Sequence, residues 1–350
     1  MASALMPEWI LILGIVAMIL IPNLGNGTFR LPIPGTSIRV PYFLGGKRYA
    51  FTNDPRLPAG IAGFTLIAAF VTAFMSQMID SDVGMGYACL AANGVVDSTS
   101  SCADAEHLLR IDAFSRTFEM IFYGALIIAL FANWDRLQAT APNRIALKKQ
   151  EDDAVESLRL TRLLNNRRQV DFYLLVLMVA FGMSVVALSA NLFVLFIGLE
   201  IASLGSYVLI SFLKETKTGP EAGLKYFIVG SVSSAIGLYG MSLLYIWNGN
   251  LSMTGTTGLA AGWLSDGSNG LAVLGLTFML VAFGFKVSAV PFHFATPDAY
   301  EGSSAPIAGV LSTASKAMGF AALMRVLIGI TLGDGESDWY VLIGLIAAIT

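Results

Sequence analysis

Long apolar runs, each close to the length that crosses a bilayer, constrain this chain more than any other feature. A membrane-spanning helix needs about 20 mostly apolar residues. Such runs lie at 9–24, 57–79, 113–133, 171–190, 191–212, 223–247, 271–300 and 305–331, and a further run begins at Trp339. Because two of them adjoin, a tight turn is expected at Ala190 and Asn191. The sequence therefore predicts an all-α, polytopic membrane helix bundle.

Composition supports this class and excludes several others. Hydrophobic residues make up 55% and charged residues 13% of the chain, whereas soluble domains average about 25% charged. The two cysteines exclude a disulfide scaffold, and no zinc-finger, haem, iron–sulfur or phosphate-loop spacing occurs. The chain alone is therefore expected to hold no cofactor and no metal, and nothing indicates a nucleic-acid partner. The start, MASALMPEWILIL, lacks a basic region and is interpreted as the first span.

The distribution of lysine and arginine predicts the orientation. Alternate loops, beginning with the one after the first span, carry most of these residues, namely Arg30, Arg39, Lys47, Arg48, Arg56, Arg136, Arg144, Lys148, Lys149, Arg159, Arg162, Arg167, Arg168, Lys214 and Lys217. The other loops carry acids instead. By the positive-inside rule, the basic loops face the cytoplasmic side and the N-terminus lies on the outer side. Trp9, Trp134, Trp247 and Trp339 fall at span ends, as in an aromatic belt.

Two loops leave alternatives open. The polar segment 134–169 is expected on the inside, either as a solvated loop or with a surface amphipathic helix over 150–164 that could bind anionic lipid. Cys89 and Cys102 share one outer loop, where they could form a disulfide or remain two thiols.

Three charged residues lie deep within the predicted spans. Glu200 is in the middle of NLFVLFIGLEIASLGSYVL, and Lys286 and Lys316 lie in the runs on either side of a break at Pro291. An ionisable group in a bilayer is costly and by default marks an ion or proton pathway. A proline in such a run frees backbone groups, which is tolerated only where protein or a wet cavity satisfies them. The structural alternative is a static pair of Glu200 with one lysine, which would add little stability.

The chemistry of these residues follows from desolvation. Burial disfavours the charged form of lysine, and an adjacent carboxylate restores it. A carboxylate that approaches or retreats would therefore make Lys286 or Lys316 a switchable proton holder. Water would have to reach each side, and the break at Pro291 could help to supply it.

The remaining charges in or near the spans give weaker signals. His293 could relay protons near neutral pH or satisfy freed backbone at the break. Lys225 could take part in the pathway or extend its ammonium group to the interface. Arg116 and Glu119 are expected to pair locally near the outer interface, and Arg325 is expected to reach the outer interface. Asp298 and Glu301 are interpreted as turn or capping residues at the cytoplasmic mouth.

At these positions the chain resembles a known family. FKVSAVPFHFATPDAYEGSSAPIAGVLSTASKAMGFAALMRVL is similar to the broken-span segment of subunit N (NADH dehydrogenase subunit 2 type) of respiratory complex I. EAGLKYFIVGSVSSAIGLYGMSLLY at 221–245 resembles the sixth span of that subunit, and Glu200 with Ser203 and Tyr207 matches its fifth. The likeness covers about 191–327, and RIDAFSRTF at 110–118 is the clearest local match among the leading spans.

The resemblance implies a proton-translocating membrane-arm subunit of a NADH:quinone oxidoreductase. Family roles carry over to Glu200, Lys286 and Lys316 as a proton relay, and less directly to His293 and Lys225. NADH, flavin, iron–sulfur clusters and quinone would belong to partner subunits in an energy-transducing membrane, bacterial, archaeal or organellar.

The resemblance also implies a division of the chain. Three leading helices would occupy 1–133, the inside loop 134–169 and the first five-helix repeat 170–331. The run at 339–350 would begin a truncated helix. Inverted repeats place ion sites on discontinuous helices, and the second repeat, with its own central lysine, is expected in a continuation or a second chain.

Two departures and two rivals accompany this interpretation. The loop 134–169 is longer than in many relatives, and the chain stops where the second repeat would begin. The main rival is a subunit of a multisubunit cation/proton antiporter without redox coupling. A non-pumping scaffold is the other, and it requires Glu200 and Lys286 to be dispensable.

Overall fold

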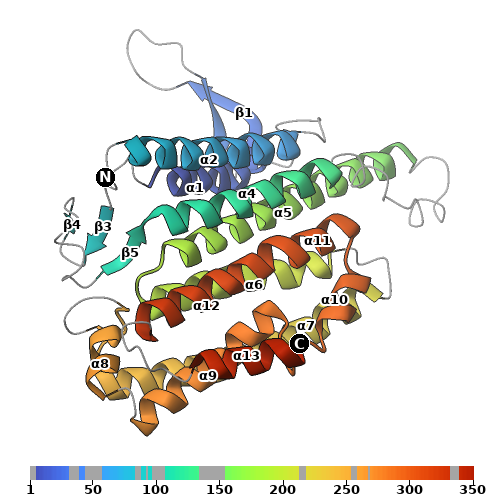
Figure 1. The fold of residues 1–350 in the computed structure, drawn as a ribbon. Helices are drawn as coiled ribbons and strands as arrows, with labels where there is room; N and C mark the ends of the chain where they lie inside the picture. Colours follow the sequence, from blue (N-terminus) through green and yellow to red (C-terminus); the bar gives the residue numbers. More distant parts are fainter. Residues whose placement is uncertain are drawn as a thin grey trace.

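The computed structural model describes residues 5–30, 39–43, 57–82, 88–91, 94–96, 107–133, 154–212, 218–253, 258–266, 269–331 and 339–350. Long helices dominate this part of the chain and run roughly alongside one another (Figure 1). They are α1 Met6–Asn23, α2 Leu57–Asp82, α4 Ala113–Asn133, α5 Ala154–Leu188, α6 Leu192–Ile210, α7 Thr218–Asn248, α8 Leu259–Asp266, α9 Gly270–Val287, α10 Thr296–Gly302, α11 Ala305–Val310, α12 Lys316–Thr331 and α13 Trp339–Ile349. A π-helical turn, Leu311–Ser315, joins α11 to α12.

The predicted membrane bundle is confirmed. Seven helical segments of the described residues are long and apolar enough to cross a membrane, from Leu57–Ser76 to Ala305–Leu327, and Met6–Leu20 is a shorter apolar helix. The expected tight turn is present, because α5 ends at Leu188 and α6 begins at Leu192. Asn191 caps α6 by accepting a hydrogen bond from the Phe193 amide at 2.9 Å, which satisfies one of the free donors at a helix start.

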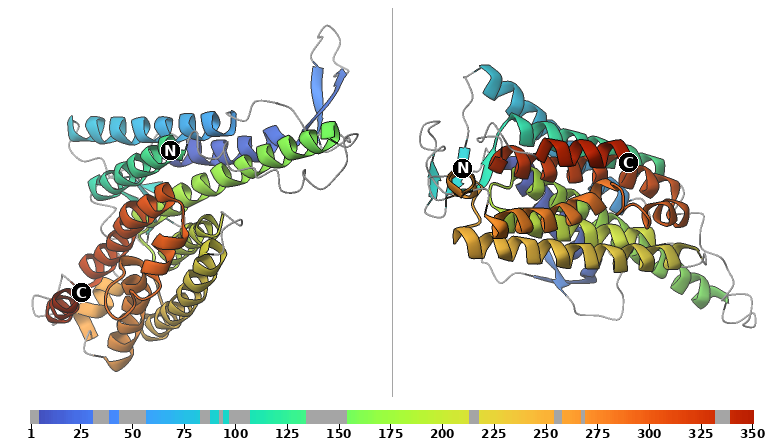
Figure 2. Two further views of the ribbon diagram at one scale, coloured as in Figure 1. Left: turned by 90° about the vertical axis from the view of Figure 1, so that its right-hand side faces the viewer. Right: turned by 60° about the horizontal axis from the view of Figure 1, so that its bottom comes forward.

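The helices lie in successive layers. α1 and α2 form one side, α4 and α5 follow, then α6 with α12, and finally α7 with α9 (Figures 1 and 2). The three leading helices thus pack against α5, and α12 crosses back from the second half of the chain to contact α4 and α5. This return brings residues far apart in sequence into one core.

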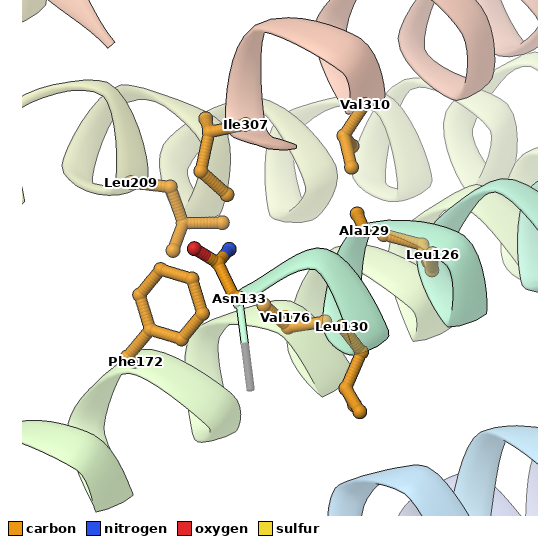
Figure 3. Close-up of a pocket in the computed structure, with 9 residues that line it drawn as sticks. All are labelled: Leu126, Ala129, Leu130, Asn133, Phe172, Val176, Leu209, Ile307 and Val310. Atoms are coloured by element: carbon orange, nitrogen blue, oxygen red, sulfur yellow. The ribbon is translucent and has the colours of Figure 1, made fainter. Parts of the chain in front are cut away.

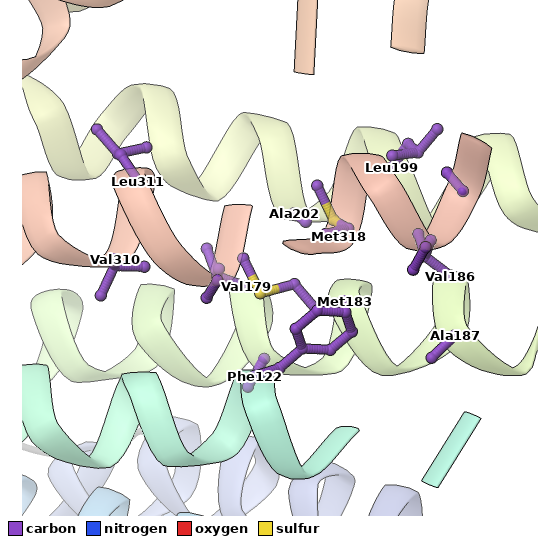
Figure 4. Close-up of a cluster of buried hydrophobic side chains, with 14 of the residues drawn as sticks. Phe122, Val179, Met183, Val186, Ala187, Leu199, Ala202, Val310, Leu311 and Met318 are labelled. Atoms are coloured by element: carbon purple, nitrogen blue, oxygen red, sulfur yellow. The ribbon is translucent and has the colours of Figure 1, made fainter. Parts of the chain in front are cut away.

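That core is apolar and closely packed. Phe122 of α4, Met183 of α5, Leu199 of α6 and Met318 of α12 meet in it (Figure 4). Elsewhere small residues let helices approach. A Cβ atom on Gly240 of α7 would lie 2.8 Å from the Phe278 side chain of α9. Lipid tails are as apolar as the helix side chains, so the hydrophobic effect does not drive helices together in a bilayer. Close packing is therefore a main source of their association.

Two features differ from the expectation of an all-α chain with a loop at 134–169. Helix α5 begins at Ala154, so the second part of that segment is continuous with the following span rather than a separate loop or surface helix.

Short strands occur between the leading helices, with β1 Leu24–Arg30 antiparallel to β2 Arg39–Phe43. β3 Ala88–Ala91 pairs with β4 Gly94–Val96 and β5 His107–Ile111. The strands lie outside the apolar runs, where water can satisfy the edges. Cys102 and Trp134 lie outside the described residues.

Candidate functional site

Glu200 lies in the middle of α6 and reaches a neighbouring helix. Its Oε1 atom accepts a hydrogen bond of 2.5 Å from the Ser234 hydroxyl of α7. The carboxylate is partly buried. A hydroxyl donor stabilises the ionised carboxylate and also offers it a partner through which a proton can pass.

Tyr207 lies two turns further along the same face of α6. Its ring packs edge-on against the ring of Tyr226 on α7, with centroids 5.4 Å apart. Its hydroxyl is buried and has no hydrogen-bond partner. Buried polar groups normally have partners, and an orphan often marks a place for a water molecule. The hydroxyl lies against the backbone of Gly230 on α7, where any larger residue would collide with it.

Lys286 is the most deeply buried of the lysines predicted as site residues. It lies in the last turn of α9 with 4% of its surface exposed. Its ammonium nitrogen is 5.4 Å from the centre of the Tyr207 ring and 5.5 Å from that of the Phe285 ring. Aromatic faces at this range attract a cation, although less strongly than a carboxylate does. The α9 backbone at this point packs against Gly319 of α12, where a Cβ atom would lie 3.0 Å from that of Lys286.

The predicted helix break is confirmed, and it begins just after Lys286. α9 ends at Val287, and Ser288 follows in the left-handed conformation with φ 63°, which non-glycine residues seldom adopt. The Val290–Pro291 peptide is cis, and the chain becomes helical again at Thr296. The break therefore separates α9 from α10, and the amides of Ser288, Ala289 and Phe292 within it donate to nearby carbonyls.

Lys316, on α12, contacts the break between α9 and α10 through Ser288. Its ammonium group donates a hydrogen bond to the Ser288 hydroxyl, and the Ser288 and Thr296 hydroxyls are 2.6 Å apart. Lys316 directly follows the π-helical turn Leu311–Ser315. Such turns widen a helix locally and are frequent at functional sites. Lysine, serine and threonine thus form a continuous polar string across the break.

Glu200 and Lys286 do not form an ion pair. Glu200 and Lys316 are nevertheless the charged groups whose fields act on Lys286. A buried lysine held by aromatic rings, with one carboxylate and one lysine at longer range, releases a proton more readily than a lysine locked in a salt bridge. The arrangement is chemically suited to a proton that moves between discrete holders.

The side chains of Lys225 and His293 are exposed, unlike that of Lys286. The Lys225 ammonium nitrogen is 2.9 Å from Glu221 on its own helix and 2.9 Å from Asp298 of α10, with half of its side chain exposed. Asp298 therefore joins α10 to α7, a contact beyond the turn role expected for it. His293 lies in the break and its side chain is exposed. Within the described residues no group of histidine, cysteine and acidic side chains could hold a metal ion.

None of the lysines predicted as site residues lines the small cavity of Figure 3. It is lined by apolar side chains that include Leu130 of α4, Phe172 of α5 and Val310 of α11, with Asn133 as its polar member. Its volume of about 10 Å³ is close to the least that can hold one water molecule. It is far too small for a nucleotide or quinone.

Two arginines expected near the outer interface pair with acids inside the bundle. The predicted pairing of Arg116 with Glu119 is confirmed, at 2.6 Å, and both side chains are buried. Arg325 does not extend into solvent. It donates to both carboxylate oxygens of Asp112, at 2.7 and 2.8 Å, and to the Ala187 carbonyl. The burial and the Asp112 partner were not foreseen, because a single helix pattern does not show which neighbouring helix covers each face.

Sequence reasoning also missed the hydroxyl groups of the site. Ser234 is one of several serines on α7, and Ser288 and Thr296 lie in a stretch read only for its proline and histidine. The one available signal was Ser288 itself, a polar residue two positions after a buried lysine. Its contact with Lys316 depends on how α12 packs against the break, which the sequence does not show.

Comparison with known proteins matches this arrangement to two related groups. The family described as NADH:quinone oxidoreductase/Mrp antiporter, transmembrane region, matches residues 189–350. The NADH-quinone oxidoreductase subunit N of Sphingopyxis alaskensis is 36% identical over 222 residues, 63% of this chain and 43% of that protein. A second such subunit, of Roseiflexus castenholzii, is 32% identical over 287 residues, 81% of this chain and 52% of that protein.

A relative with another electron donor in its name is equally similar. The F420H2 dehydrogenase subunit N of Methanosarcina mazei is 33% identical over 245 residues, 69% of this chain and 43% of that protein. The chain thus spans about half the length of the curated relatives that it matches.

Solved structures share the fold. A chain of respiratory complex I from Thermus thermophilus gives a TM-score of 0.59 at 24% identity, over 91% of this chain and 53% of that chain. A chain of the Mrp complex from Dietzia sp. gives a TM-score of 0.64 at 18% identity, over 97% of this chain and 50% of that chain. At these identities the likeness shows the fold alone.

Proposed function

Because this chain belongs, through residues 189–350, to the antiporter-like membrane subunits of NADH:quinone oxidoreductases, we propose that it is a proton-translocating subunit in the membrane arm of such a complex. NADH oxidation and quinone reduction would take place in partner subunits, which would hold the flavin and iron–sulfur clusters. Another relative is named as a subunit of an F420H2 dehydrogenase, so the electron donor of the complex would have to be identified separately.

One observation carries the proposal. Lys286 is almost completely buried at the end of a broken helix and has no carboxylate in direct contact. Desolvation without a salt bridge lowers the free energy needed to release the lysine proton, and a carboxylate that moved closer would hold that proton more firmly. Glu200, tethered through Ser234 on α7, is the carboxylate placed to exert this control.

The proton would move in discrete steps. Protons held near Glu200 and Ser234 would pass to Lys286 through water at the orphan hydroxyl of Tyr207. From Lys286 they would reach Lys316 and then the Ser288 and Thr296 hydroxyls across the break. Water-mediated bonds are nearly as favourable as direct ones, so gaps between these groups do not prevent transfer. Lys225 and Asp298, at the exposed end of α7, would form an access point.

Replacement of Lys286 tests the proposal. The Lys286→Ala variant of the intact complex, reconstituted into liposomes, should retain NADH oxidation with a reduced proton yield for each NADH. The Lys286→Arg variant should not recover the yield, because arginine does not release its proton in proteins. Lys149→Ala, in the predicted inside segment, is the matched control and should pump normally.

Two outcomes would contradict this function. A normal proton yield from Lys286→Ala would exclude the residue from the pathway. Purification of the native assembly without flavin and iron–sulfur subunits, together with sodium-dependent proton exchange, would instead support an antiporter subunit that works without electron transfer.

A further inference from the structure

A second group of buried charges lies among the leading helices, outside the matched region 189–350. Glu8 of α1, Arg116 and Glu119 of α4, and Ser184 of α5 are each at most 6% exposed. The Arg116 guanidinium is 2.6 Å from Glu119 Oε2 and 3.5 Å from Glu8 Oε1. The Ser184 hydroxyl oxygen is 3.0 Å from Glu8 Oε1 and 3.0 Å from Glu119 Oε1.

The hydroxyl of Ser184 determines how many protons this group requires. A serine hydroxyl has one hydrogen to donate and can accept through its lone pairs. Two ionised carboxylates can only accept, so Ser184 could satisfy one of them while the other faced its oxygen without a hydrogen between them. If one carboxyl is protonated, it donates to Ser184 Oγ, and Ser184 donates to the other carboxylate. Both short distances are then hydrogen bonds.

The charge balance also requires that one of the two carboxyls is protonated. Two ionised carboxylates and one guanidinium would leave a net negative charge in a buried site, which is strongly unfavourable. Among the described residues, the ion pairs of Glu8 and Glu119 involve Arg116 alone. Residues 57–76 of α2 contain no charge, and Asp112, just before α4, is held by Arg325 of α12 and by Arg110. One added proton makes the group neutral.

Orphan polar atoms at the same place point to a bound species. The Tyr123 hydroxyl and Glu8 Oε2 are buried and have no hydrogen-bond partner. Tyr123 follows Glu119 by one helical turn, so it lies on the same face of α4, and the charges of Glu119 and Glu8 act on its hydroxyl. An orphaned hydroxyl beside two carboxyls is suited to a shared proton and an accompanying water molecule.

We propose that Glu8, Glu119 and Ser184, held by Arg116, form a site that binds one exchangeable proton between α1, α4 and α5. The ligand is a proton shared by two carboxyls through the serine hydroxyl, as in other carboxyl pairs that cannot both ionise. The inference does not depend on the function proposed for Lys286, because none of these residues belongs to that group.

Infrared spectroscopy of the purified complex provides the test. The wild-type protein at neutral pH should show a carboxylic-acid C=O band that shifts in D₂O. Glu8→Gln and Glu119→Gln should each abolish this band, because a single remaining carboxylate pairs with Arg116 and needs no proton. Glu301→Gln, at an exposed position, is the matched control and should keep the band.

Two further variants keep the test decisive. Arg116→Leu removes the positive charge that pairs with both carboxyls, so both should become neutral and the band should grow about twofold. The double variant Glu8→Gln and Glu119→Gln removes both carboxylates from beside buried Arg116 and should lower the melting temperature more than the two single variants together. Absence of the band in the wild-type protein, or its survival in both single glutamine variants, would overturn the proposal.

Discussion

The Tyr207 hydroxyl on α6 lies against the backbone of Gly230 on α7, so closely that a Cβ atom at position 230 would overlap it. This contact holds the hydroxyl against α7, and the ring of the same tyrosine is 5.4 Å from the Lys286 ammonium nitrogen. Helix α7 therefore contributes to the site both through the Ser234 hydroxyl and by having no side chain at position 230.

Gly230→Ala should destabilise the protein by about 1–3 kcal/mol, the usual range for overpacking. Removal of the hydroxyl by Tyr207→Phe should recover part of this loss, because the added methyl group collides chiefly with that oxygen. Unfolding in mixed micelles measures both effects. Gly60→Ala has open space around the added atom and should be neutral or stabilising. If Gly230→Ala lowered the free energy of unfolding equally in the presence and in the absence of Tyr207→Phe, the hydroxyl would not be the group with which the added methyl collides.

Ser288→Gly separates the backbone role of Ser288 from its hydroxyl role. Glycine adopts φ 63° without the penalty of about 1–2 kcal/mol that other residues incur in the left-handed region, so the helix break should remain intact. The link between Lys316 and Thr296 would be lost. We expect normal assembly with a lower proton yield for each NADH. A full yield would show that protons do not pass through the Ser288 hydroxyl.

Glu200 and Lys286 should behave as one unit if the carboxylate controls the proton on the lysine. The losses of proton pumping in Glu200→Gln and Lys286→Ala should then be non-additive when the two changes are combined. Liposome assays on the two single variants and the double variant complete the cycle. Fully additive losses would separate the residues into independent steps.

The ion pair of Asp112 with Arg325 should contribute stability that depends on pH. Burial alone would raise the pKa of Asp112, but hydrogen bonds and the charge of Arg325 outweigh it and hold the pKa below its usual value. A carboxyl with a lowered folded-state pKa stabilises the fold above its unfolded pKa of about 3.9. That contribution is lost as the pH falls through the lower folded-state value.

Asp112→Asn tests this pair. At neutral pH the variant should lose about 3 kcal/mol, because Arg325 is left in a mostly buried site without its counter-charge. The difference from the wild-type protein should begin to shrink below about pH 4, where Asp112 of the unfolded chain takes up a proton, and should go on shrinking until the pH passes the lowered folded-state pKa. A difference that stayed constant down to acidic pH would show that the charge of Asp112 does not stabilise the fold.

The orientation predicted from the basic loops can be tested directly. A single cysteine introduced within 134–153 should react with a membrane-impermeant reagent only from the cytoplasmic side, or its matrix or stromal equivalent. A cysteine introduced next to Met1 should react only from the opposite side. Labelling with the reverse pattern would place the N-terminus on the inside.

The sequence by itself determined the class of fold, most span positions, the helix break and the deep charges. Each of these is a local property. A bilayer demands about 20 apolar residues for each helix, a proline interrupts the backbone bonds of its own helix, and an isolated charge in an apolar run is conspicuous without its neighbours. Glu200, Lys286 and Lys316 could therefore be chosen before any packing was known.

Only the tertiary structure decided which groups meet. Ser234 lies 34 positions from Glu200, and Asp112 lies 213 positions from Arg325. In an apolar helix every face looks alike in sequence, so the periodicity that marks the buried side of a soluble helix is missing. Arg116 and Glu119 illustrate the consequence, because their pairing follows from a spacing of three residues while their burial depends on α1 and α5 packing over them. Those neighbours bring Glu8 and Ser184 to the pair, which the spacing along α4 does not show.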